Sequence, residues 1–125
     1  MKKFLLAGIF IAIILAGAAF WFFGRSCDLS KADTSGIILF YGTGCPHCAN
    51  VDEYIKNNNV KEKIQFAEKE IFYNKCNAKL LEDLAPKCGF SLSDLGVPFL
   101  WNGASSTCLG GDQDIINFFK EKIGG

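Results

Sequence analysis

The sequence has no excess of positive charge, because its 13 lysine and arginine residues are balanced by 13 acidic residues over 125 positions. Without residues 1–25, which hold three of the basic side chains, the remainder has a charge of −3 (10 basic minus 13 acidic). This balance excludes a basic nucleic-acid-binding module, so nucleic acid is not an expected partner. The chain also lacks repeats and low-complexity segments, and its 50% hydrophobic content excludes an intrinsically disordered chain. Its length allows one ordinary domain.

Charged residues are also absent from Phe4 to Phe23, a run of twenty residues (FLLAGIFIAIILAGAAFWFF). As a helix this run would be about 30 Å long, the thickness of the hydrocarbon core of a bilayer. Lys2 and Lys3 precede the run and only Arg25 follows it closely, so the positive-inside bias predicts a cytoplasmic N-terminus. We therefore predict one N-terminal transmembrane helix within residues 1–25, with the aromatic residues 20–23 at its outer end.

The same segment has a second interpretation, as a cleaved signal peptide that would release a secreted protein. Residues 4–15 would form its apolar region and Ala16-Gly17-Ala18 its cleavage site. The apolar run continues past this site into four aromatic residues, which favours the anchor. A lipoprotein signal ending at Cys27 is disfavoured, because no apolar residue stands directly before that cysteine. Each interpretation places residues 26–125 outside the cytoplasmic membrane.

Apolar runs and turn residues divide this exported part into a polar linker, residues 26–36, and one α/β domain, residues 37–125. We expect strands at 37–41, 64–67, 97–101 and 107–109. Helices are expected after Pro46, between residues 73 and 95, and over 112–123, so that the order is βαβ, then α, then ββα. The last helix is amphipathic, and its inward face is predicted to carry Ile115, Ile116, Phe119 and Ile123.

Cys45-Pro46-His47-Cys48 is the motif that most requires a chemical explanation. It follows a predicted buried strand and begins a helix, which is the context of a C-x-x-C redox pair. The free N–H groups of the helix start stabilise a thiolate at Cys45, and Cys48, one turn later, can attack a mixed disulfide. Pro46 suits the first turn of a helix. A protonated His47 adds a positive charge beside the sulfur, which stabilises the reduced pair and makes the disulfide a stronger oxidant.

This motif, together with the preceding strand and the later Val97-Pro98, resembles the thioredoxin superfamily. The C-P-H-C sequence with a valine before the proline is similar to the Dsb-type oxidases of that superfamily. The stretch from Gly96 to Asp114 is more similar to a glutaredoxin, because a V-P strand and a hairpin lead to a Gly-Gly pair. The resemblance covers about residues 37–123 and implies a thioredoxin-like fold with a central four-stranded mixed sheet. It also implies a cis Pro98 that packs against the cysteine pair and a Val97 backbone that pairs with substrate.

Neither subfamily matches in every feature. The large helical insertion of the Dsb-type oxidases is missing, since about 24 residues separate Phe72 from Gly96, and glutaredoxins usually lack a membrane helix. The glutaredoxin-like pattern implies substrate contacts at Gly110 and Gly111 and makes glutathione a possible co-substrate. These two glycines are also explained as a simple turn before the last helix.

Three residues of the motif have a metal-binding alternative. Cys45 and Cys48 with His47 can be part of a zinc site. The chain has no second C-x-x-C pair, however, since Cys76 and Cys88 are twelve residues apart, so we predict no metal site. Outside the motif, Pro98 has an alternative interpretation as a trans proline in an edge strand.

Four acidic residues lie at the ends of predicted elements. Asp112 or Asp114 is interpreted as a helix N-cap or first-turn acid of the last helix. Glu68 and Glu70 follow the second strand and are expected on a solvated face. The alternative for the latter two is a buried carboxylate that accepts a proton from the resolving cysteine.

The four remaining cysteines are expected to form disulfides in an oxidising compartment. Cys76 and Cys88 flank a predicted helix and would lie about 18 Å apart on a straight one, so they pair only if the chain turns back near Pro86. We predict this Cys76–Cys88 disulfide. Cys27 and Cys108 then either pair with each other or leave Cys108 as a further redox partner.

These features predict a membrane-tethered thiol–disulfide oxidoreductase that acts outside the cytoplasmic membrane. Cys45 is the expected nucleophile, Cys48 the resolving thiol, His47 the thiolate stabiliser and Pro98 the residue that holds substrate. No metal or organic cofactor is expected, because the dithiol itself carries two electrons. The expected partners are protein thiols or disulfides and a membrane or soluble redox partner, with the direction of transfer open. The alternatives are a glutathione-linked reductase and a non-catalytic binding or metal-carrier module.

Overall fold

The computed structural model describes residues 1–23 and 27–124. Gly24 and Arg25, the last two residues of the predicted anchor, and Ser26, the first of the predicted linker, lie outside the described residues. The side chains of residues 2–5 and 21–23 also lie outside the description, so the expected aromatic end of the anchor and the two N-terminal lysines are not placed.

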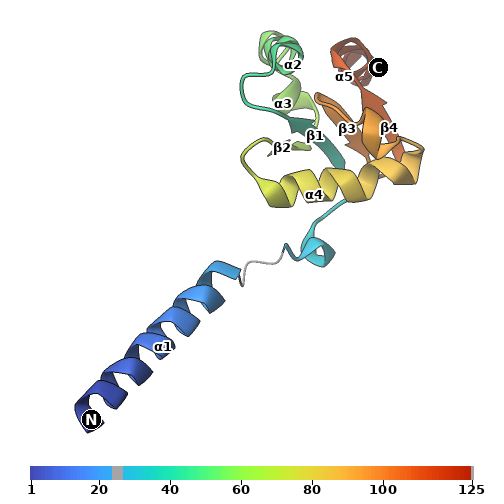
Figure 1. Cartoon of the computed structure of the whole chain (residues 1–125). Coiled ribbons are helices and arrows are strands. Elements are labelled where there is room, and N and C mark those ends of the chain that lie inside the picture. Colours follow the sequence, from blue (N-terminus) through green and yellow to red (C-terminus); the bar gives the residue numbers. More distant parts are fainter. Residues whose placement is uncertain (24–26, 125) are drawn as a thin grey trace.

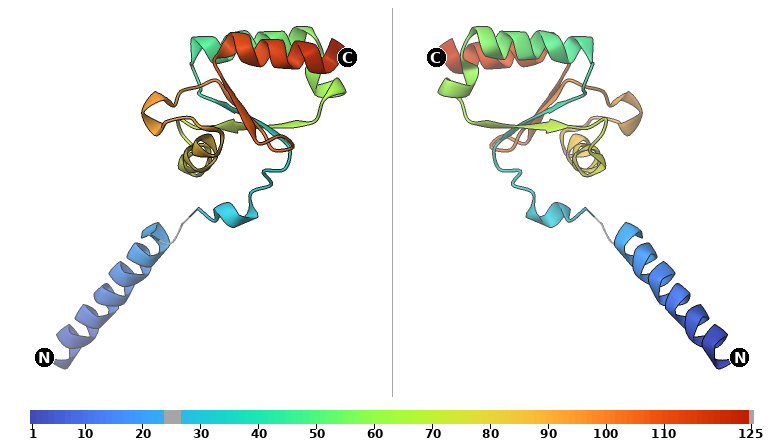
Figure 2. Two further views of the ribbon diagram at one scale, coloured as in Figure 1. Left: turned by 90° about the vertical axis from the view of Figure 1, so that its right-hand side faces the viewer. Right: turned by 90° about the vertical axis from the view of Figure 1, so that its left-hand side faces the viewer.

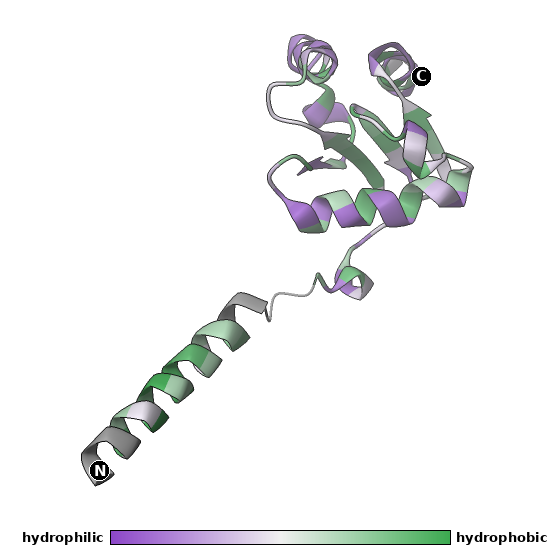
Figure 3. Ribbon diagram, viewed as in Figure 1, coloured by the Kyte–Doolittle hydropathy of each residue, from purple (hydrophilic) through white to green (hydrophobic). Residues whose placement is uncertain are grey.

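The first element is the helix α1 (Lys2–Phe23), drawn in blue in Figure 1. Figure 3 shows that its central part is hydrophobic. The large apolar side chains that are described there are exposed, among them Phe10 at 68% and Ile14 at 66%. Among the described residues, no helix meets the length and apolarity required for a membrane span.

A four-stranded mixed sheet forms the centre of the folded part, as the resemblance implies. Its strands are β1 (Ile37–Tyr41), β2 (Phe66–Glu70), β3 (Phe99–Asn102) and β4 (Thr107–Gly110). The strand order is β2-β1-β3-β4, with β1 parallel to β2 and antiparallel to β3, and β3 antiparallel to β4. The second and third strands each begin two residues later than predicted.

Helices cover both faces of this sheet (Figure 2). One face carries α2 (Pro46–Asn57), the short α3 (Val60–Lys63) and α5 (Asp112–Gly124). The other face carries α4 (Lys75–Leu84), which continues into the 3-10 helix η2 (Ala85–Cys88). A second 3-10 helix, η3 (Leu92–Asp94), follows before β3.

The two faces of the sheet have separate hydrophobic cores because side chains alternate along each strand. On β1, Ile38 and Phe40 face α4, whereas Leu39 between them faces α2 and α5. Phe99 and Trp101 on β3 join the first core and Leu100 joins the second, and all are at most 5% exposed. The α5 face is completed as predicted by Ile115 and Phe119, both fully buried, with Ile116 and Ile123 partly buried beside them.

Residues 27–36, which the composition predicts as a linker, pack against the domain. The 3-10 helix η1 (Leu29–Lys31) places Leu29 against the core on the α4 face. The indole Nε1 of Trp101 donates to the carbonyl of Thr34 at 2.8 Å, and the N–H of Gly103 donates to the carbonyl of Gly36 at 2.9 Å. This segment is therefore part of the folded unit.

The four structural cysteines pair as Cys27–Cys76 and Cys88–Cys108. The predicted Cys76–Cys88 disulfide is wrong, and so is the Cys27–Cys108 pair that would have accompanied it. Pro86 does not turn the chain back, because it occupies the first turn of η2, which extends α4. Cys76 and Cys88 thus lie at opposite ends of one helical stretch.

The chain leaves this helical stretch at Gly89, which has a φ of 86° and ends η2. Strand β4 then passes beside η2 and brings the Cα of Cys108 within 5.9 Å of the Cα of Cys88. Cys108 is therefore not a free redox partner.

Because the two disulfides close separate loops of 49 and 20 residues, we predict that they stabilise the domain independently. Chain-entropy reasoning gives about 4 kcal/mol for Cys27–Cys76 and about 3 kcal/mol for Cys88–Cys108. Denaturant unfolding of two variants, each with both cysteines of one disulfide replaced by serine, measures both free energies. Peptide mapping without reductant serves as the control, and recovery of a peptide that links residues 76 and 88 contradicts this pairing.

Candidate active site

The C-P-H-C motif lies where β1 ends and α2 begins. Cys45 is the N-cap residue of α2, with extended backbone angles (φ −75°, ψ 120°), and Pro46 occupies the first turn. The preceding turn closes with a 3.1 Å hydrogen bond from the Cys45 N–H to the carbonyl of Gly42. Gly44 adopts a φ of 81°, and Gly42 is in contact with the ring of Phe72, which occupies the space a Cβ would need.

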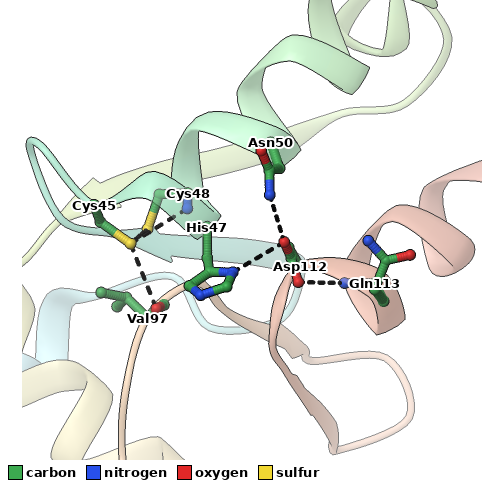
Figure 4. Close-up of polar contacts among 7 residues, drawn as sticks. All are labelled: Cys45, His47, Cys48, Asn50, Val97, Asp112 and Gln113. Carbon is green, nitrogen blue, oxygen red and sulfur yellow. Dashed lines mark hydrogen bonds and ion pairs between the residues drawn. The ribbon is translucent and has the colours of Figure 1, made fainter.

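Cys45 and Cys48 form a closely spaced free dithiol (Figure 4). The two sulfur atoms lie 2.7 Å apart, and the backbone N–H of Cys48 donates to the Cys45 sulfur at 3.3 Å. Cys45 is partly exposed, whereas Cys48 is buried. Burial raises the pKa of the Cys48 thiol to about 12, and its hydrogen bond to the Cys45 sulfur acts in the same direction. Cys45 therefore presents the accessible sulfur of the pair, and the buried Cys48 thiol is protonated at neutral pH.

The segment before β3 lies beside the dithiol. Its Val97–Pro98 peptide bond is cis, as the resemblance implies, and Pro98 is buried. The carbonyl of Val97 is 3.6 Å from the Cys45 sulfur. This proximity follows from the sheet register, in which Phe40 near the end of β1 pairs with Phe99 at the start of β3.

The predicted residues Gly110 and Gly111 are at the same edge of the sheet. Gly110 pairs with Phe99 across the β3–β4 hairpin, and a Cβ at this position would lie 3.3 Å from the ring of Phe90. Gly111 has a φ of 92°, and its N–H donates to the carbonyl of Pro98 at 3.0 Å. Both glycines thus adjoin the cis-proline segment and lead into α5.

His47 points across the site toward the start of α5 (Figure 4). Its Nδ1 lies 3.1 Å from Oδ2 of Asp112, and Nδ2 of Asn50 donates to the same oxygen at 2.6 Å. From the sequence, Asp112 is predicted only as an acid at the start of the last helix, and no role is predicted for Asn50. A histidine and a carboxylate 65 residues apart carry no local signal of their contact, which depends on how α2 and α5 pack.

The carboxylate of Glu70 joins the motif loop to the segment before α4. It accepts hydrogen bonds from the backbone N–H groups of Thr43, Phe72, Tyr73 and Asn74. Burial alone raises the pKa of Glu70, but these donors outweigh it and hold the pKa below the usual range. Glu70, which was expected on a solvated face, thus has a structural role that the sequence did not indicate. Glu68 forms an ion pair with Lys61, as a surface residue can.

A cleft of about 520 Å³ opens beside the dithiol. Both cysteines and Pro46 line it, together with the charged residues Asp52, Lys61 and Glu68. In the part of the chain that the structure describes, no group of three or more His, Cys, Asp or Glu side chains is arranged to hold a metal ion. Within these residues, the arrangement is suited to exchange of thiols and disulfides at Cys45.

The comparison with known proteins adds no family assignment: no protein-family model matches the chain, and no curated protein matches it either.

The burial of Cys48 and its raised pKa predict that alkylation at neutral pH is selective for Cys45. With the disulfides intact, we expect iodoacetamide to modify Cys45 at least about 100-fold faster than Cys48, because the thiolate is the reactive form. Mass spectrometry of timed samples measures both rates, and the protein unfolded in urea is the control in which both residues react. Equal rates in the folded protein would contradict the assignment of nucleophile and resolving thiol.

Proposed function

We propose that this protein is a thiol–disulfide oxidoreductase with a thioredoxin-like domain. The observation that carries the proposal is the position of the Cys45 sulfur, which is partly exposed at the start of α2 and accepts the Cys48 N–H. A helix N-terminus stabilises negative charge on such a sulfur, and the adjacent buried thiol supplies the second half of a redox pair. The carbonyl of Val97, which lies 3.6 Å from the same sulfur, also supports the proposal.

The exchange proceeds in two steps. The Cys45 thiolate attacks one sulfur of a substrate disulfide, so that a mixed disulfide forms and the other substrate sulfur leaves as a thiolate that takes up a proton. Cys48 then loses its proton and attacks the Cys45 sulfur, and the second substrate thiol leaves with a proton. The substrate has gained two electrons, and Cys45 and Cys48 have become a disulfide. The reverse sequence oxidises a dithiol substrate.

Protein thiols and disulfides are the proposed substrates. The carbonyl of Val97 faces the nucleophilic sulfur, so a substrate chain that lies along this segment would bring its cysteine to Cys45. Gly110 and Gly111 border the same segment, and the space beside Gly111 is open. A membrane-bound or soluble redox partner would restore the starting state of the dithiol.

We also propose that residues 4–23 hold the domain at the outer side of the cytoplasmic membrane. The charge-free sequence supports this, as do the exposed apolar side chains of α1. The two structural disulfides of the domain fit an oxidising compartment. Cleavage after Ala18, with release of the domain, is the alternative.

Removal of the resolving thiol is expected to trap the intermediate. When Cys48→Ser is incubated with insulin or glutathione disulfide, a mixed disulfide at Cys45 should accumulate, because no second thiol can attack it. The reduced wild-type protein should release the substrate thiols and form the Cys45–Cys48 disulfide without accumulating the adduct, and Cys45→Ser should form no adduct. In a separate turnover assay with dithiothreitol as the source of electrons, Cys45→Ser should lose insulin reduction to background. Non-reducing electrophoresis and mass spectrometry measure the adducts. Unchanged insulin reduction by Cys45→Ser would refute the proposed function.

For the anchor, we predict that the full chain fractionates with membranes and resists extraction by alkaline carbonate. N-terminal sequencing of the mature protein should find the residues of α1 still attached. A chain that begins near Phe20 and is recovered in the soluble fraction would refute the anchor, without bearing on the exchange chemistry. The domain alone, residues 26–125, serves as the soluble reference.

A further inference from the structure

Asp112 connects three parts of the site. Its Oδ2 contacts Nδ1 of His47 and accepts from the side chain of Asn50, while its Oδ1 accepts from the N–H of Gln113 at the start of α5. The Asp112 side chain is 15% exposed, in contrast to 70% for the side chain of His47. The residue before it, Gly111, donates to the carbonyl of Pro98. Contacts from α2 and from the start of α5 therefore hold the Asp112 carboxylate in place.

Few other contacts hold the side chain of His47 in place. Within the described part of the chain, the contact with Asp112 is the one hydrogen bond that its side chain makes. Figure 4 shows the imidazole between the Cys45 side of the site and Asp112. Without Asp112, a side chain with this exposure would be free to rotate into solvent.

We propose that Asp112 is a positioning residue, which holds the imidazole of His47 beside the dithiol and thereby sets the reduction potential of the Cys45–Cys48 pair. The inference rests on the proposed function, since it concerns the same dithiol. It assigns to the start of α5 a part in the chemistry of a motif 65 residues earlier in the chain.

The charges of Asp112 and His47 predict the direction in which the reduction potential changes when the Asp112 charge is removed. The contact is strongest when the imidazole is protonated, because it then joins opposite charges through a hydrogen bond. An imidazolium held near Cys45 favours the thiolate and so stabilises the reduced pair. The Asp112 carboxylate by itself has the opposite effect, since one negative charge disfavours another. Removing its charge therefore lowers the potential if Asp112 acts through His47, and raises it if Asp112 acts directly on the thiolate.

Asp114 provides a matched comparison. It lies in the same first turn of α5 and has the same charge, but it is exposed and makes no side-chain hydrogen bond or ion pair among the described residues. For Asp112, in contrast, the hydrogen bonds from Asn50 and then His47 hold the pKa of the carboxyl below its usual range, against the effect of burial. If the reduction potential depended only on acidic charge at the start of α5, removing the charge of Asp112 or of Asp114 would change it equally.

The test compares Asp112→Asn, His47→Ala, the double variant and Asp114→Asn in the full chain, each equilibrated with glutathione and its disulfide. We expect Asp112→Asn and His47→Ala each to shift the equilibrium constant on the order of tenfold toward the oxidised pair, a fall in potential of about 30 mV. The double variant should match His47→Ala alone, and Asp114→Asn should match the wild type. If Asp112→Asn does not fold, Asp112→Ser, which also presents an oxygen to the helix start, takes its place.

An unchanged potential in Asp112→Asn would limit Asp112 to a structural role and overturn the inference, and so would a raised potential. Equal shifts in Asp112→Asn and Asp114→Asn, or additive shifts in the double variant, would overturn it as well. All these outcomes leave the proposed function standing, because the wild-type pair still exchanges with glutathione. A wild-type pair that exchanges neither with glutathione nor with insulin would refute both.

Discussion

The capping of α2 by the Cys45 sulfur is the interaction on which the rest of the site depends. An ordinary helix begins with an oxygen that accepts an N–H of the first turn, and here a sulfur atom accepts the Cys48 N–H at 3.3 Å. The same contact places the two sulfur atoms side by side and exposes only the first. The Cys45 sulfur therefore both caps the helix and is the accessible sulfur of the pair. The Glu70 carboxylate and the turn at Gly42 fix the loop that carries it.

The order of the strands assembles the site around this cap. Because β3 runs antiparallel to β1, its first residues lie beside the last residues of β1, and Val97-Pro98 comes next to Cys45. Because β4 pairs back along β3, the chain returns to the same edge at Gly110. Helix α5 then begins there, which brings Asp112 to His47. Residues far apart in sequence thus meet at one edge of the sheet.

Local patterns in the sequence were sufficient to predict most of this arrangement. The apolar run 37–41, the helix start at Pro46 and the amphipathic face of Ile115 and Phe119 are found where they were predicted. Contacts that depend on how whole elements pack were not predictable in this way. The pairing of Cys88 with Cys108 depends on β4 passing η2, and the position of Asp112 depends on α5 lying beside α2. Pro86 was misread because a proline is compatible with the first turn of a new helix as well as with a break.

The redox equilibrium of the wild-type dithiol tests whether Cys45 and Cys48 form a reversible redox pair. Mass spectrometry of the protein in glutathione buffers of varied ratio, after acid quenching and alkylation, reports the fraction of chains with Cys45 and Cys48 joined. We predict one reversible two-electron transition, in which the joined form lacks two hydrogen atoms and the disulfides Cys27–Cys76 and Cys88–Cys108 stay intact. A Cys45–Cys48 pair that stays reduced, or that accumulates only glutathione adducts on Cys45, would contradict it.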